Sequence, residues 1–144
     1  MTESNNTSNE SNQDKNDLSQ EKLSQNTRIL QSINLFQGLT EEKSKEIAKN
    51  CEVLKYRLGL PLTDINFIQN KILILIEGQA RLIGHINNEK TTILKLGKGS
   101  FVGLSSLIRN SPCEEIIAST DVVALSTGST NMCCKLLSLN SVLI

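Results

Sequence analysis

The sequence is poor in the side chains that most often build stacking platforms, metal centres and catalytic pairs. It has no tryptophan, one tyrosine, three phenylalanines and a single histidine, His85. Few aromatic rings leave few surfaces on which single-stranded bases could stack. With one histidine, we expect neither a His-based metal site nor a catalytic histidine pair, and we interpret His85 as a strand surface residue. We therefore expect no enzyme, no cofactor and no nucleic-acid partner.

Cysteine spacing and apolar runs exclude further classes. The four cysteines, at positions 51, 113, 133 and 134, form no C-x-x-C motif, and the adjacent pair suits neither a zinc knuckle nor an ordinary disulfide. The longest apolar run, ILILI at 72–76, is far too short to cross a bilayer. No apolar segment of the signal-peptide kind follows Met1. The sequence thus predicts a cytoplasmic chain with reduced thiols and no membrane span.

Charge and apolar content change near residue 26. Residues 1–26 hold five of the fifteen acids and two of the fifteen bases, and Met1, Leu18 and Leu23 are their only large apolar residues. Such a segment cannot bury enough apolar surface to offset its ordering entropy. We expect 1–26 to be a disordered Asn/Ser-rich tail, with frayed helix near its end, and 27–144 to be one folded domain. That domain carries a net charge of +3, too mild to indicate nucleic-acid binding on its own.

The remaining pattern predicts a mainly β domain with flanking helices. Ile29, Leu30, Ile33 and Phe36 recur at helical spacing, and Thr40 is suited to cap a second helix after Gly38. Short β-type runs follow, with a hairpin turn at NNEK and a helical pattern over 129–144 at the end. The runs cover 52–57, 58–64, 71–78, 79–86, 91–97, 98–103 and 116–127. Their spacing predicts an antiparallel β-roll or sandwich.

Several stretches, in this order, resemble the cyclic-nucleotide-binding domain family. They are LFQGLTEEKSKEIA at 35–48, YRLG at 56–59, ILILIEGQARLIG at 72–84, LKLGKGSFVGLSSLI at 94–108 and IIASTDVVAL at 116–125. The resemblance covers roughly residues 30–144. It implies the β-roll of that family, a double-stranded β-helix or jelly roll. It also implies a regulatory rather than a catalytic role.

A narrower resemblance concerns GLSSLIRNSPCEEIIAST at 103–120. It is similar to the N-terminal domain of cyanobacterial peptidase-containing ABC exporters. This implies a second interpretation, in which the chain is the sensory front part of such an exporter, as a fragment or a stand-alone homologue. The partner is then an ABC exporter rather than another protein. A transcription regulator of the catabolite-activator kind is not expected, because a helix-turn-helix would have to follow the roll.

The same stretch corresponds to the phosphate-binding cassette of the cyclic-nucleotide-binding family. Gly103 and Pro112 keep the residues of the family pattern, and Ser105 and Ser106 lie in its short helix. Leu104 stands where the family has glutamate and Cys113 where it has arginine. Glu115 stands at the alanine position, and Ile116 at the position of a hydroxyl residue.

These replacements predict loss of the usual ligand. A guanidinium binds a cyclic phosphate through two charge-assisted hydrogen bonds, and a carboxylate accepts from the ribose hydroxyl. An unpaired buried ion costs about 3–5 kcal/mol, and the lost hydroxyl partner about 1–3 kcal/mol. A micromolar complex has only about 8 kcal/mol of binding free energy, so tight binding of cyclic AMP or cyclic GMP is not expected.

Two cassette residues carry alternatives. Arg109 is either a solvated loop residue, the favoured interpretation, or a substitute cation that turns toward the phosphate. Cys113 is either a small buried hydrophobe, again favoured, or a sensing thiol activated by the nearby helix.

Overall fold

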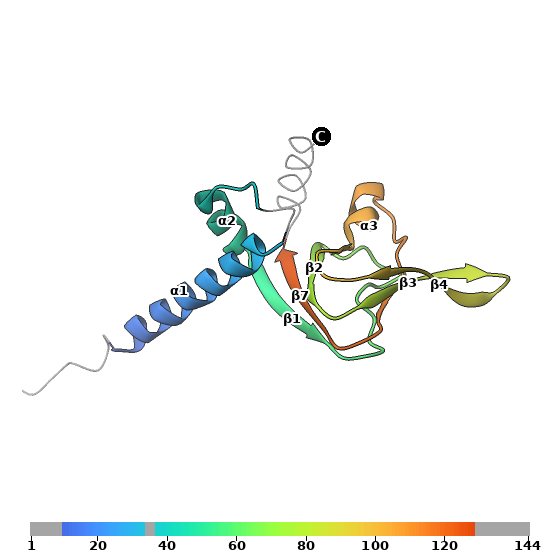
Figure 1. Cartoon of the computed structure of the whole chain (residues 1–144), viewed down its shortest axis with the longest axis horizontal. Helices are drawn as coiled ribbons and strands as arrows, with labels where there is room; N and C mark the ends of the chain where they lie inside the picture. The colour runs from blue at the N-terminus through green and yellow to red at the C-terminus, as the bar shows by residue number, and fades with distance from the viewer. Residues whose placement is uncertain (1–9, 34–36, 129–144) are drawn as a thin grey trace, which may run out of the picture.

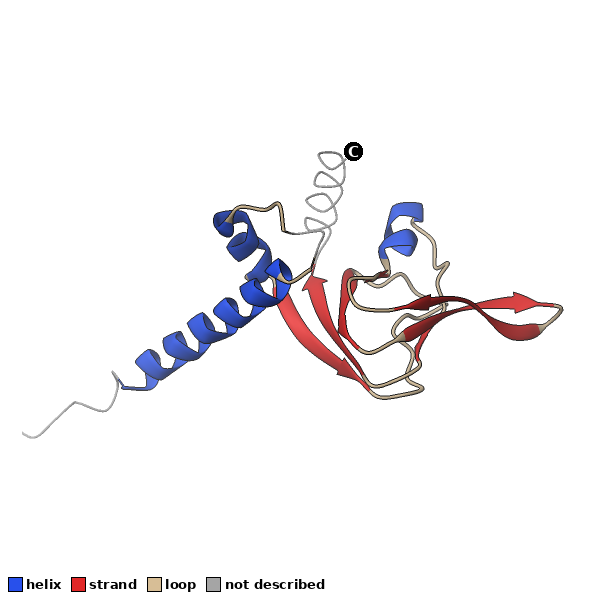
Figure 2. Cartoon of the chain, in the orientation of Figure 1, coloured by secondary structure: helices blue, strands red, loops and turns tan. Residues whose placement is uncertain are grey.

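The structure, a computed structural model, describes residues 10–33 and 37–128. Two helices precede an antiparallel β-roll that holds one further short helix (Figures 1 and 2). The helices are α1 (Glu10–Gln31), α2 (Glu41–Ala48) and α3 (Leu104–Arg109). The strands are β1 (Cys51–Tyr56), β2 (Lys71–Glu77), β3 (Ala80–Ile86), β4 (Glu89–Leu96), β5 (Phe101–Val102), β6 (Ile116–Ala118) and β7 (Val122–Gly128). The predicted β-roll is confirmed. The helix expected over 129–144, with Cys133 and Cys134, lies outside the described residues.

The strands form two sheets, one with the order β1-β7-β2-β5 and one with the order β4-β3-β6. The segment 58–64, expected as a strand, is instead a loop that runs along β6. The amides of Gly59 and Leu62 donate to the carbonyls of Ala118 and Ile116, and the Ala118 amide donates to the Leu60 carbonyl. Between them lies Pro61, which has no amide hydrogen and therefore interrupts a regular ladder.

The apolar run in β2 is buried on both faces of its sheet. Ile72 and Ile74 contact a cluster that includes Leu30 and Ile47 from the two N-terminal helices. The alternating residues Leu73 and Leu75 contact the second cluster, inside the roll. Because successive side chains of a strand point to opposite faces, one strand supplies the centre of both cores. No helix within the described ranges is long and apolar enough to span a bilayer.

Helix α1 differs from the expectation of disorder before residue 27. Residues 10–31 form one helix, which extends away from the roll in Figure 1. The segment contains neither proline nor glycine, so nothing in it breaks a helix. Its last turns are anchored, because Leu30 is buried and the buried Asn26 side-chain amide donates to the Cys51 carbonyl at 3.1 Å. The low apolar content correctly indicates exposure, with Leu18 67% exposed, but it does not exclude a helix.

The hairpin of β3 and β4 projects from the roll (Figure 1). Its turn is the predicted one, with Asn87 and Asn88 at φ 53° and 65°. Such left-handed pairs match the twist of a two-residue hairpin, and asparagine tolerates them. Farther along, β4 contains a bulge at Ile93, whose side chain covers Gly84; a Cβ on that glycine would lie 2.2 Å from the Ile93 Cδ1.

Gly78, in the turn between β2 and β3, is restricted by backbone rather than by a side chain. Its φ is +86°, and a Cβ there would lie 2.1 Å from the carbonyl oxygen of Asp121.

Thr40 caps α2 as predicted. Its side-chain hydroxyl accepts a hydrogen bond from the Lys43 amide.

Candidate functional site

The segment that corresponds to the predicted cassette begins with a glycine in left-handed backbone geometry. Gly103 precedes α3 at φ +91°, and a Cβ there would lie 3.1 Å from the Lys71 carbonyl oxygen. A side chain at this position would be strained, which explains the glycine. Helix α3 then ends at Asn110, which has left-handed geometry. The segment predicted to be the cassette therefore forms a short helix with a left-handed residue at each end.

Leu104 does not point at an open polar site. It is partly buried and, with Phe101 and Leu107, packs against the cluster that contains Ile72 and Ile74. An apolar side chain at the expected carboxylate position therefore contributes to the core. It offers no acceptor to a sugar hydroxyl.

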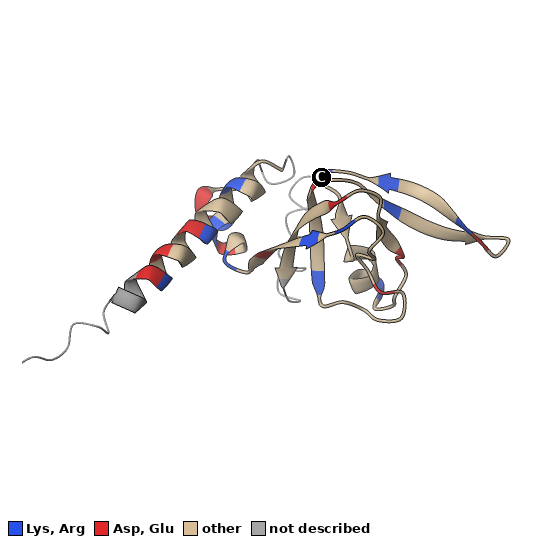
Figure 3. Ribbon diagram, turned by 90° about the horizontal axis from the view of Figure 1, so that it is seen from below, with Lys and Arg blue, Asp and Glu red and all other residues tan. Residues whose placement is uncertain are grey.

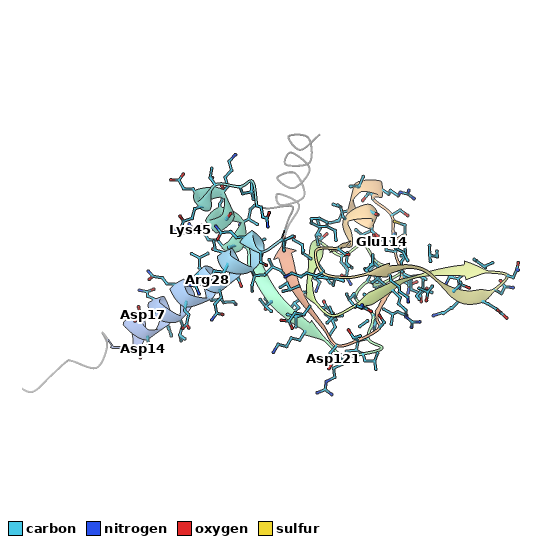
Figure 4. The ribbon with its side chains drawn as sticks, in the orientation of Figure 1. Asp14, Asp17, Arg28, Lys45, Glu114 and Asp121 are labelled. Carbon is cyan, nitrogen blue, oxygen red and sulfur yellow. The ribbon has the colours of Figure 1, made fainter. Side chains whose placement is uncertain are left out.

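Ser106 fastens the second half of the cassette. Its hydroxyl is buried, accepts from the Cys113 amide at 3.3 Å and donates to a Glu114 carboxylate oxygen at 3.4 Å. Its carbonyl accepts from the Ser111 amide at 3.1 Å. Figure 4 labels Glu114 on the roll beneath α3. Ser106 therefore fixes the loop between α3 and β6 through three hydrogen bonds, one of which reaches the Glu114 carboxylate.

Cys113 is exposed, so the favoured prediction of a buried hydrophobe is wrong. The loop places this residue at the surface, where its amide and its thiol both contact the Ser106 hydroxyl, the thiol at 3.6 Å. Cys51, the other described cysteine, is buried, and this burial raises the pKa of its thiol to about 11. It is therefore a neutral thiol at pH 7.

Glu115 lies apart from the cassette helix and contacts the hairpin. Its carboxylate is 14% exposed and lies 2.8 Å from the Lys90 Nζ and 3.0 Å from the His85 Nε2. The hydrogen bond from Lys90, followed by that from His85, holds the pKa of Glu115 below its usual value. His85 is on the strand surface as predicted, but its interaction with Glu115 was not foreseen. The pair joins β3 and β4 to the start of β6.

Ile116 and Pro112 bracket the end of the loop. Ile116 is 1% exposed within the roll core, so it does not form part of a pocket mouth. Its amide donates to the Thr63 hydroxyl at 3.0 Å, and that hydroxyl donates to the Glu114 carbonyl at 2.8 Å. Pro112 is half-buried before this clip. Thr63 comes from a segment 51 residues earlier than Glu114, and the sequence carried no local signal for it.

Within the described part of the chain, no cation stands at the cassette positions that the family uses to bind the ligand. Arg109 is exposed in the last turn of α3, and Ser105 is exposed in its first turn. Ion pairs join Lys45 to Glu41, and His85 and Lys90 to Glu115, and none of these cations belongs to the cassette. In the same ranges, no three His, Cys, Asp or Glu side chains gather to hold a metal ion. The loop presents the Glu114 carboxylate at the Ser106 hydroxyl, and neither Leu104 nor Cys113 carries a positive charge.

Comparisons with known proteins agree with this fold. No family model matches the chain. A cGMP-dependent protein kinase of Plasmodium berghei is 27% identical over 120 residues, which are 83% of this chain and 13% of the kinase. The regulatory domain of Toxoplasma gondii PKA, solved with cAMP, superposes with a TM-score of 0.76 at 17% identity, over 88% of this chain and 50% of that one.

A third relative, the regulatory subunit of a cAMP-independent protein kinase A from Trypanosoma cruzi, was solved with guanosine. It superposes with a TM-score of 0.75 at 17% identity, over 87% of this chain and 46% of that one. The chain thus spans half or less of each of these proteins. None of the three is a peptide exporter, and the exporter relation stays a prediction. The chain has the fold of the cyclic-nucleotide-binding domains, a β-roll with helices before its first strand.

Proposed function

We propose that the chain is a non-catalytic regulatory and interaction module whose degenerate cassette does not bind cAMP or cGMP tightly. The observation that carries this proposal is the pair of replaced ligand groups: Leu104 packs into the core and Cys113 brings no charge. The Glu114 carboxylate beside Ser106 adds like charge, which repels a phosphate. The fold likeness to kinase regulatory subunits supports a role through protein contacts. No observation favours an exporter over another protein partner.

Calorimetry with cAMP, cGMP and guanosine tests this proposal. We expect no heat of binding for either cyclic nucleotide at concentrations up to about 100 µM, because the missing partners reduce the affinity to millimolar or weaker. Guanosine is the matched control for charge, since it has a sugar and a base without a phosphate. A low-micromolar dissociation constant for cAMP or cGMP would contradict the proposal, and loss of that binding in Arg109→Gln would identify Arg109 as the substitute cation.

The division of the chain at residue 27 is part of the same proposal. Only the last turns of α1 are buried, so we expect the domain of residues 27–144 to keep its fold when the exposed turns before the anchored Asn26 are removed. Limited proteolysis should cut before Asn26 and leave a stable product. Protection of residues 10–25 equal to that of the roll would contradict this division.

A further inference from the structure

Strand β4 forms one edge of its sheet within the described residues, because the order is β4-β3-β6. An edge strand presents unpaired amides and carbonyls, and natural proteins usually shorten, cover or bulge such edges. Here β4 has eight residues, projects with its hairpin from the roll and has a single bulge (Figure 1). Its backbone is open to an added strand.

The two faces of the hairpin differ in chemistry. Ala80 and Leu82 of β3 point into the roll core, so the same face carries Ile86, Ile93 and Leu94 farther out, where no core covers them. These three side chains are 57%, 61% and 54% exposed. The inner face of the hairpin is therefore an apolar strip that extends beyond the core.

The outer face carries two cations that lie directly opposite each other. Arg81 of β3 pairs in register with Lys95 of β4, and like charges in this position are destabilising. The Arg81 Nη1 reaches only the Thr92 hydroxyl, at 3.5 Å, and its Nε is buried without a partner. Neither cation forms an ion pair with a described residue, whereas Lys90 is already paired with Glu115. Figure 3 shows basic residues spaced along both strands of the hairpin.

From these features we infer that β4 is the docking edge for an extended acidic segment of a partner protein. A strand added to β4 would place a carboxylate beside Lys95, whose neighbour on β3 is Arg81, on the outer face and apolar side chains beside Ile93 and Leu94 on the inner face. A second copy of this chain would bring the same cations and would not neutralise them. The inference rests on the proposed role as an interaction module, but it does not depend on the cassette.

A fluorescein-labelled octapeptide of alternating glutamate and valine, blocked at both ends, is the probe. Fluorescence anisotropy with the full chain should give saturable binding that weakens with added salt, and an alternating lysine–valine peptide should not bind. The variant Lys95→Glu should weaken binding about fivefold, because it removes an exposed attractive charge pair, worth up to about 1 kcal/mol, and adds a repulsive one. The matched control is Lys98→Glu, an exposed lysine in the turn after β4, which should change binding less than about twofold.

A second peptide, N-methylated at alternate residues, separates strand addition from simple charge attraction. It keeps the carboxylates and removes the donors of the ladder, so it should not bind. Equal binding of this peptide, equal effects of Lys95→Glu and Lys98→Glu, or no binding of the unmodified peptide at millimolar concentration would each overturn the inference. So would self-association of the chain that the peptide does not reverse, since the edge would then hold a second copy.

Circular dichroism of each variant checks that the roll is intact; both lysines are exposed, so neither change disturbs the core. Calorimetry with cyclic nucleotides reports on the cassette alone. Tight cAMP binding would overturn the proposed function and leave the edge site unaffected. Failure of the peptide with silent calorimetry would overturn only the edge site.

Discussion

Restoring the two missing ligand groups should give the cassette measurable affinity for a cyclic nucleotide. The variant with Leu104→Glu and Cys113→Arg supplies a carboxylate and a guanidinium. Together these contribute about 4–8 kcal/mol, from about 3–5 for the paired ion and about 1–3 for the hydroxyl partner. Leu104 is partly buried against the cluster that contains Ile72 and Ile74, so replacing it lowers the free energy of unfolding by about 1 kcal/mol, which is a cost to the fold and not to binding. The binding contribution exceeds the roughly 4 kcal/mol between millimolar and micromolar affinity only in its upper range.

The geometry of Glu114 requires one further change. Its carboxylate lies 3.4 Å from the Ser106 hydroxyl, which itself is 3.6 Å from the Cys113 thiol. A guanidinium introduced at position 113 would therefore form an ion pair with the Glu114 carboxylate, and this pair would compete with binding of a phosphate. We expect the double variant to bind cAMP weakly, and the triple variant with Glu114→Ala to bind about tenfold more tightly, the effect of roughly 1.4 kcal/mol.

Isothermal titration of cAMP into both variants measures this difference, and circular dichroism confirms that each is folded. The variant Glu114→Ala alone is the control and should bind nothing, because it still lacks both ligand groups. If the triple variant is folded and gives no heat at millimolar cAMP, the loop geometry does not support a phosphate. The correspondence between residues 103–116 and the family cassette would then be wrong.

Three further predictions concern stability. Ser106→Ala should lower the free energy of unfolding, measured by urea denaturation, by about 1–2 kcal/mol, because it removes the buried hydroxyl that holds the loop. The control Ser105→Ala, at an exposed neighbour, should have almost no effect. Equal effects of the two variants would refute the role of Ser106. The pKa of Glu115 is held low in the folded state, so its interactions stabilise the fold above the ordinary glutamate pKa and are lost as the pH falls. The stability difference between the wild type and Glu115→Gln should therefore shrink from pH 7 toward pH 3, and a constant difference would contradict the assignment. Gly78→Ala should lower the free energy of unfolding by about 2–4 kcal/mol, since its new Cβ meets a backbone carbonyl at positive φ. Gly84→Ala should lower it by only about 1 kcal/mol, because the flexible Ile93 side chain can move aside. Calorimetric melting that ranks the two variants the other way would refute this.

Features with a local cause were predictable from the sequence. The Asn87–Asn88 turn, the Thr40 cap and the glycine before the cassette helix each depend on a residue and its near neighbours. The β-type run expected over 71–78 also has a local cause, its apolar residues, and it forms β2.

Features that depend on distant neighbours were not predictable. Thr63 contacts residues more than 50 positions away, and His85 reaches Glu115 across 30 positions, so no spacing rule identifies either contact. The exposed position of Cys113 likewise has no signal in its neighbouring residues, and its amide and thiol both contact Ser106, seven positions earlier. Composition failed for α1, because it measures what a segment can bury and not whether its backbone can form a helix.

The order of strands in the larger sheet has a consequence during synthesis. Strand β7 lies between β1 and β2 and pairs with both, so the last strand described in the sequence is a central strand of the sheet. Cys51 is opposite Thr127, which makes this among the longest-range pairings in the roll. Until β7 has emerged from the ribosome, the edges of β1 and β2 that pair with it expose backbone amides and carbonyls without a hydrogen-bonding partner, and such edges favour aggregation. A nascent chain stalled before residue 122 should therefore recruit chaperones, and release of the following seven residues should end that need.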